Sequence, residues 1–167
     1  IIKENGFSFY ELKSILEKRT SNCLDVESIM SFEQVNKEIW SIGAEIFVPA
    51  AASRLLSQKQ LDMLIENGLE VISAGANVPF ADKEIFFGPI SESADKRISV
   101  LPDFIANCGM ARAFSYFMQD DIKMTDLSIF QAVSDTIKIA LENTYKINNN
   151  KTAISKTAFE IALKQLI

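Results

Sequence analysis

The 167-residue sequence contains no histidine, and its two cysteines, Cys23 and Cys108, lie far apart. Without histidine, the chain has no Ser-His or Cys-His pair for nucleophilic catalysis and no His-rich metal site. Two widely spaced cysteines are typical of a reducing compartment rather than of a disulfide-stapled domain, so we expect a cytoplasmic protein. Any chemistry must therefore use Lys, Asp, Glu, Ser or a cofactor, and we expect no metal site.

Long basic runs and long apolar runs are also missing. The 17 basic and 22 acidic residues give a net charge of −5, and no run of Lys or Arg is longer than Lys18-Arg19. This balance disfavours binding to nucleic acid or to an anionic membrane. No apolar run approaches the ~18 to 20 residues of a membrane span. Because the chain begins at Ile1 without a methionine, we expect it to be part of a longer polypeptide.

The sequence does contain 48% hydrophobic residues, which is enough to form a buried core. It also contains three local patterns that are typical of helix starts. A serine followed three residues later by Glu or Gln is a capping box, in which each side chain accepts a hydrogen bond from the other residue's backbone N–H. The pairs are Ser8 with Glu11, Ser31 with Gln34, and Ser57 with Gln60. They predict helices over about 9–18, from 32 to near Gly43, and from 58 to Gly68.

Three short apolar runs, at 46–48, 69–72 and 98–101, predict strands that are buried on both faces. Alternation of helices and strands predicts an α/β fold, in which helices cover a parallel sheet. After Asp103 the pattern is helical, over about 104–119 and 126–145, and a last amphipathic helix carries Ile154, Ala158, Ala162 and Leu166. The sequence therefore predicts a sheet followed by C-terminal helices.

The residues after each strand combine small side chains with proline. The three exits read VPAAAS at 48–53, AGANVP at 74–79 and LPDFIANCG at 101–109. In open parallel sheets, ligands bind at the carboxyl ends of the strands, where small residues allow close approach and an amide can both donate and accept. Because Gly, Pro and Asn are also the commonest turn formers, each exit taken alone favours a tight loop, and only the three exits together leave a ligand site and a set of turns equally open.

Together the phrases AEIFVPAA (44–51), VISAGANVPF (71–80) and VLPDFIANCGMA (100–111) resemble three successive signatures of the amino-acid dehydrogenase family. That family comprises the glutamate, leucine, phenylalanine and valine dehydrogenases. The resemblance implies that residues 1–118 are the second half of an NAD(P)-binding domain, with a partial Rossmann-like parallel sheet. Residues 119–167 would be a C-terminal helical segment that packs on it within the same domain.

Site residues follow from the same resemblance. It implies that Ala50 and Ala51 pass the ribose and pyrophosphate side of NAD or NADP. Asn77 would lie near the nicotinamide ribose, and Asn107 at the nicotinamide end.

The resemblance also implies that Ala111 and Phe114 line the substrate side chain. Phe114 stands where glutamate-specific members carry a small hydroxyl residue. An aromatic side chain there would favour an apolar substrate side chain over a carboxylate. The alternative is that Phe114 packs in a core with Phe104 and Phe117.

Departures from the family pattern limit what this chain can do. Ala74 stands where most glutamate-type members have an acidic residue. No Gly-x-Gly-x-x-Gly motif is present, because the six glycines are never two positions apart. The substrate-binding lysines and the proton-transferring aspartate of the family have no counterpart, so we expect no catalytic residue in this chain.

The leading hypothesis is that the full-length protein is an NAD(P)-dependent dehydrogenase that deaminates an L-amino acid to a 2-oxo acid and ammonium. Its expected partners are a missing N-terminal substrate domain of the same polypeptide and further copies of itself in a homo-oligomer. The alternatives are a non-catalytic small-ligand-binding or regulatory module with half a nucleotide-binding fold, and a helical interaction domain whose strand exits are only turns.

Overall fold

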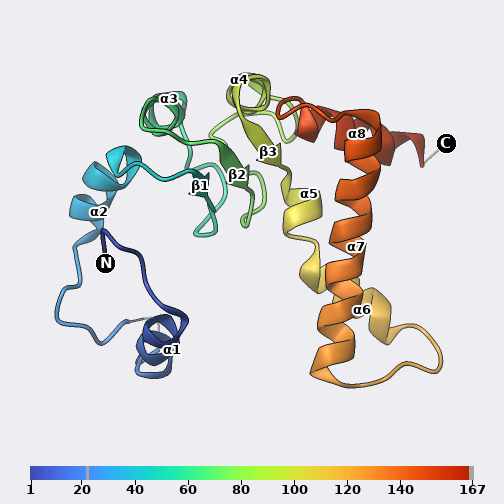
Figure 1. The fold of residues 1–167 in the computed structure, drawn as a ribbon, viewed down its shortest axis with the longest axis horizontal. Helices are drawn as coiled ribbons and strands as arrows, with labels where there is room; N and C mark the ends of the chain where they lie inside the picture. Colours follow the sequence, from blue (N-terminus) through green and yellow to red (C-terminus); the bar gives the residue numbers. More distant parts are fainter. Residues whose placement is uncertain (22, 166–167) are drawn as a thin grey trace. The chain divides into compact units, whose positions relative to one another are not determined.

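The computed structural model describes residues 1–21 and 23–165, which form two compact units, Ile1–Ile42 and Gly43–Ile167 (Figure 1). Leu166, expected on the last helix, lies outside the described residues. Among the described helices, none is both long and apolar enough to cross a membrane.

The described residues of the first unit contain two short helices and a single turn of 3-10 helix, and both helices begin at the predicted capping boxes. These elements are α1 (Phe9–Glu17), α2 (Phe32–Glu38) and η1 (Ile39–Ser41). At α1, the Glu11 N–H donates to Ser8 Oγ at 3.3 Å, and the Ser8 N–H donates to Glu11 Oε2 at 2.8 Å. No residue of α1 or α2 is buried, so local hydrogen bonds rather than a core define these helices.

The second unit is built on the predicted parallel sheet, in the order β1-β2-β3. The strands are β1 (Ile46–Phe47), β2 (Val71–Ser73) and β3 (Ser99–Leu101). Register pairs Phe47 with Ile72 and Ile72 with Val100. The crossovers carry α3 (Gln58–Glu66), which starts at the third capping box, and α4 (Pro89–Arg97), which the sequence analysis did not predict.

The core of this unit lies between the sheet and α3, where Leu61 and Ile72 have no exposed surface. The prediction that all strands are buried on both faces is wrong for β1, because Ile46 is 62% exposed and Val48 is 55% exposed. Both β1 and β3 are edge strands of the described sheet, each paired with β2, but β3 is packed against α4 and the last described helix, whereas the main contact of β1 is with β2. Ile72, on the central strand, and Val100, on the helix-covered β3, are buried as expected.

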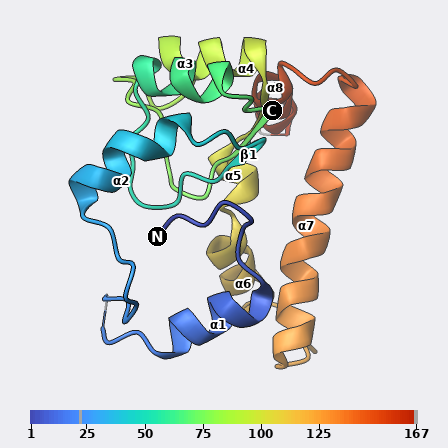
Figure 2. The same cartoon turned by 60° about the vertical axis from the view of Figure 1, so that its left-hand side comes forward.

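Four helices follow the sheet: α5 (Asp103–Ala106), α6 (Gly109–Phe117), α7 (Asp126–Ile147) and α8 (Ile154–Lys164). α7 packs along α5, α6 and α8, and α8 packs on β3 and α4 (Figure 2). The single helix predicted over 104–119 is wrong, because it is broken at Asn107, whose φ of −112° and ψ of 19° are not helical. Outside the helix, the Asn107 side chain forms a hydrogen bond with another loop.

Candidate functional site

The exits of β1 and β2 run side by side and are joined by backbone hydrogen bonds. The Ala76 N–H donates to the Pro49 carbonyl at 2.7 Å, and the Arg54 N–H donates to the Val78 carbonyl at 2.7 Å. Gly75 suits this close approach, because a Cβ there would lie only 3.0 Å from the Cβ of Ala50. The small residues of the two motifs therefore serve, first of all, to let two loops pass closely.

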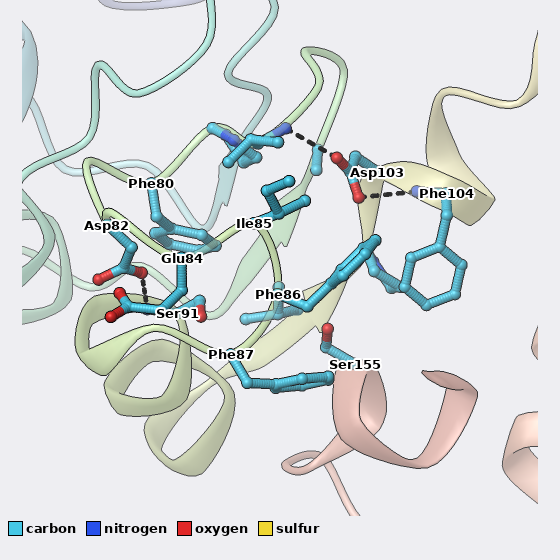
Figure 3. Close-up of a pocket in the computed structure, with 15 residues that line it drawn as sticks. Phe80, Asp82, Glu84, Ile85, Phe86, Phe87, Ser91, Asp103, Phe104 and Ser155 are labelled. Carbon is cyan, nitrogen blue, oxygen red and sulfur yellow. Dashed lines mark hydrogen bonds between the residues drawn. The ribbon is translucent and has the colours of Figure 1, made fainter. Parts of the chain in front are cut away.

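The exits of β2 and β3 are joined through side chains. Asp103 Oδ2 accepts the Val78 N–H at 2.7 Å, and Oδ1 accepts the N–H of Phe104 at 2.9 Å (Figure 3). Asn107 and Asn77 are thirty residues apart in the chain, and Asn107 Nδ2 donates to Asn77 Oδ1 at 2.7 Å. The three exits thus form one hydrogen-bonded rim at the carboxyl edge of the sheet.

Four of the six predicted site residues lie on this rim, and all four are exposed: Ala50, Ala51, Asn77 and Asn107. Asn77 and Asn107 are brought into direct contact, and Ala50 packs against Gly75. Exposure leaves these groups accessible to a ligand. The site that the sequence indicates is therefore an open surface along the strand exits.

The other two predicted residues, Ala111 and Phe114, are exposed on α6. They are three positions apart, so they are neighbours on one face of that helix. Phe114 is 60% exposed, so within this unit it is not a core residue, whereas Phe104 packs edge-to-face on Phe86 with ring centroids 6.4 Å apart. Within this unit, Phe114 therefore does not pack in a core with Phe104 and Phe117.

Ala74, one of the positions at which the sequence departs from the resemblance, is only 1% exposed and continues the sheet. Its N–H donates to the Leu101 carbonyl at 3.1 Å. A carboxylate here would be buried beside apolar strands and would need partners of its own. Alanine at this position therefore suits the packing of β2 against β3.

Two residues of the rim were missed by the sequence analysis, Asp103 and Arg54. Asp103 is the first residue of α5, where an acidic side chain is expected from the helix dipole alone, so its second role is hidden in the sequence. Arg54 has a left-handed φ of 59°, and its guanidinium donates to the Asp82 carbonyl. Nothing in its sequence neighbourhood signals that contact, because Asp82 is 28 residues away.

A cavity of about 40 Å³ is lined by Asp103 (Figure 3) and by Val78 of the rim. Its walls are largely apolar and include the aromatic rings of Phe80, Phe86, Phe87 and Phe104. This volume holds about one or two waters. None of the four exposed rim residues predicted to bind a cofactor lines it, so the cavity is not the candidate site.

Ser155, on the cavity wall, ties α8 to a buried carboxylate. Its N–H donates to Asp95 Oδ1 at 2.9 Å, and the Lys156 N–H donates to Oδ2 at 3.0 Å. Burial raises the pKa of the Asp95 carboxyl, and these N–H groups oppose that rise. Asp95 thus caps α8 from a distant position in the chain.

Comparisons with known proteins agree with this architecture. The model of the Glutamate/Leucine/Phenylalanine/Valine dehydrogenase family matches residues 1–167. Glutamate dehydrogenase and glutamate dehydrogenase 2 of Plasmodium falciparum are similar in structure, with TM-scores of 0.58 and 0.61, each at 20% identity over 92% of this chain. At this identity the likeness shows the fold.

The matched region is 34% and 35% of those two chains, so this chain spans about a third of their length. A comparison with curated proteins finds no match. With the family model matched over the whole sequence, the chain belongs to the glutamate/leucine/phenylalanine/valine dehydrogenase family.

Proposed function

We propose that this chain forms the nicotinamide half of the cofactor cleft in an NAD(P)-dependent amino-acid dehydrogenase. Residues 1–118 contribute the second half of the dinucleotide-binding domain, and 119–167 brace it. The complete enzyme oxidises an L-amino acid to a 2-oxo acid and ammonium. The N-terminal part of the enzyme, outside this chain, supplies the substrate domain, and the complete chains assemble as a homo-oligomer.

The observation that carries the proposal is the hydrogen bond between Asn107 Nδ2 and Asn77 Oδ1, at 2.7 Å. It joins the exits of β2 and β3, and ligands of open parallel sheets bind at the carboxyl ends of strands. Both amides are exposed. Two turns that merely reverse the chain would not need their side chains to meet.

The remaining atoms of this pair fit a nicotinamide. Within the described residues, Asn77 Nδ2 and Asn107 Oδ1 have no protein partner, which leaves one donor beside one acceptor. A primary carboxamide or a pair of ribose hydroxyls presents the complementary pattern. Turning both amides over would leave the same pattern, so the fit does not depend on which oxygen accepts.

In this role, the chain's own residues bind and orient. The cofactor supplies hydride acceptance, which is chemistry that no side chain offers. Asn77 and Asn107 hold the nicotinamide end by hydrogen bonds, and the small side chains of Ala50 and Ala51 let the ribose and pyrophosphate approach the backbone. The acid–base groups belong to the remainder of the enzyme.

Ala111 and Phe114 face the substrate side chain in this proposal. A large exposed aromatic leaves no partner for a substrate carboxylate, so we propose that the amino acid has an apolar side chain. Replacing Phe114 with Ser should then raise kcat/KM for glutamate relative to leucine by about tenfold, since a hydroxyl would hydrogen-bond the carboxylate. An unchanged ratio of the two kcat/KM values would show that Phe114 does not line the substrate pocket.

The test is amino-acid-dependent reduction of NAD⁺ and NADP⁺ by the full-length polypeptide, followed by absorbance of the reduced nicotinamide. Glutamate, leucine, phenylalanine and valine are the substrates to compare. The proposal predicts turnover with at least one of them. No reduction with any amino acid would contradict it.

The alternative, a non-catalytic module that binds a small ligand, is favoured by one observation. The predicted cofactor residues Ala50, Ala51, Asn77 and Asn107 carry no titratable group, and the Asp103 carboxylate beside them already accepts two N–H groups. Binding of NAD(H) or NADP(H) by the full-length polypeptide without turnover would support this alternative.

A further inference from the structure

The residue that links the two asparagine-bearing exits is Asp103. Its carboxylate accepts the N–H of Val78, which follows Asn77, and its own backbone carbonyl accepts the Asn107 N–H at 2.8 Å. One residue therefore holds the backbone beside Asn77 with its side chain and the backbone of Asn107 with its main chain.

The backbone that Asp103 holds is strained. Val78 has a φ of 47°, in the left-handed region that a β-branched residue rarely occupies. Such a conformation is unfavourable and persists only where its surroundings over-determine it. Here both peptide groups of Val78 are held: the N–H by Asp103 and the carbonyl by the Arg54 N–H at 2.7 Å.

The turn at Val78 directs the neighbouring Asn77 side chain toward Asn107. If Val78 relaxed to an extended conformation, the chain would leave the rim at a different angle and the 2.7 Å bond between the two amides would be lost. A hydrogen bond to a carboxylate is about twice as strong as a neutral one, which suits a group that must hold strain.

We infer that Asp103 is a positioning residue for cofactor binding: its carboxylate holds the left-handed turn at Val78 and thereby keeps Asn77 against Asn107. The inference rests on the proposed function, because it assigns Asp103 a task in the same site. Asp103 acts through the asparagines and does not itself contact the cofactor. Its carboxylate is occupied by the N–H groups of Val78 and Phe104.

The chain offers a matched control in Asp95. Its carboxylate also accepts two backbone N–H bonds, at 2.9 and 3.0 Å, but it caps α8 and has no bond to the rim. Asp103→Asn and Asp95→Asn each keep one acceptor oxygen and lose the charge. A role confined to stability should affect both variants alike.

The experiment is fluorescence titration of the full-length polypeptide with NADH and with NADPH. We expect Asp103→Asn to raise the Kd about tenfold and Asp103→Ala to raise it further, while Asp95→Asn stays within about twofold of wild type. Hydrogen exchange at the Val78 amide should be faster in Asp103→Ala and unchanged in Asp95→Asn. Equal Kd values for Asp103→Asn and Asp95→Asn would overturn the inference.

A second variant tests the strain directly. Asparagine tolerates a positive φ better than valine, so Val78→Asn should lower the need for the carboxylate. In the Asp103→Ala background it should recover most of the lost affinity, to within about threefold of wild type. No recovery would overturn the inference. Failure of the wild-type polypeptide to bind either nucleotide would instead contradict the proposed function.

Discussion

The two compact units of the chain show two ways in which a sequence specifies a helix. In Ile1–Ile42, the helices α1 and α2 begin at capping boxes and bury no residue. In Gly43–Ile167, α3 begins at the same device but also buries Leu61 and Leu64. Local chemistry starts a helix in both units, whereas burial that stabilises it is present only in the second.

The second unit also contains helix starts that are capped by carboxylates from outside the helix. Asp82, eight residues before Ile90, caps α4 by accepting the N–H groups of Ile90 and Ser91, both at 2.9 Å. Asp95 caps α8 from 60 residues away. Gly88 shows how tightly the first of these caps is packed, because a Cβ there would lie 2.3 Å from Asp82 Cγ. In this unit, carboxylates bring separate segments together at the ends of helices.

Truncating a core side chain should separate the two units most strongly. Leu61 in α3 is fully buried, so Leu61→Ala should lower the free energy of unfolding of its unit by about 2–5 kcal/mol. Leu12 in α1 is 46% exposed, and Leu12→Ala should cost less than about 1 kcal/mol. Urea unfolding followed by circular dichroism measures both. Equal costs would mean that the first unit has a core of its own.

The shared capping box allows a matched comparison with a smaller expected effect. Replacing Ser57 with Ala should cost about 1 kcal/mol, and because α3 carries part of the core, the loss should lower the unfolding midpoint. Replacing Ser8 with Ala removes the equivalent bond from a helix without buried residues. We expect faster amide hydrogen exchange within α1 and no shift of the midpoint. A lower midpoint for Ser8→Ala would contradict the contrast.

These caps also explain how far the sequence could predict the fold. Ser8, Ser31 and Ser57 act on donors within three residues, so α1, α2 and α3 were predicted with correct starts. α4 was missed because its residues, PISESADKR, are mostly polar and its cap comes from Asp82, outside the helix. The helix break at Asn107 was missed as well, because its amide is used by Asn77, thirty residues away.

The candidate site was predictable to a similar extent. The strand exits and their asparagines could be found from small residues, proline and amides that follow apolar runs. The role of Asp103 could not, because it depends on the left-handed φ of Val78 and on a bond across 25 residues.

The smallest expected effect is an opposite response to acid in the two units. Hydrogen bonds from Lys3 and then from the Ser8 backbone lower the pKa of Glu11 from 4.5 to about 2. Its ionised form therefore stabilises the folded state above pH 4.5, and this contribution is lost as the pH falls toward 2. Acid should thus fray α1, and Glu11→Gln should remove that dependence. Hydrogen exchange within α1 as a function of pH measures it.

Asp95 in the second unit should respond in the other direction. Burial raises the pKa of its carboxyl in the folded state above 3.8, so the folded chain takes up a proton before the unfolded chain does. The contribution of Asp95 to stability therefore rises as the pH falls through its folded pKa, and it stops changing below 3.8. Asp95→Asn should remove this rise in urea unfolding measured between neutral and acidic pH. A difference in unfolding free energy between wild type and variant that does not change with pH would contradict this expectation.

The most direct test of the central claim is a double-mutant cycle on Asn77 and Asn107, read as the Kd of the full-length polypeptide for NADH and NADPH. If the two amides act as one unit, Asn77→Ala and Asn107→Ala should each raise the Kd about tenfold, and the double variant should be little weaker than either single variant. Unchanged Kd values in all three variants would contradict the claim that the strand exits hold the cofactor.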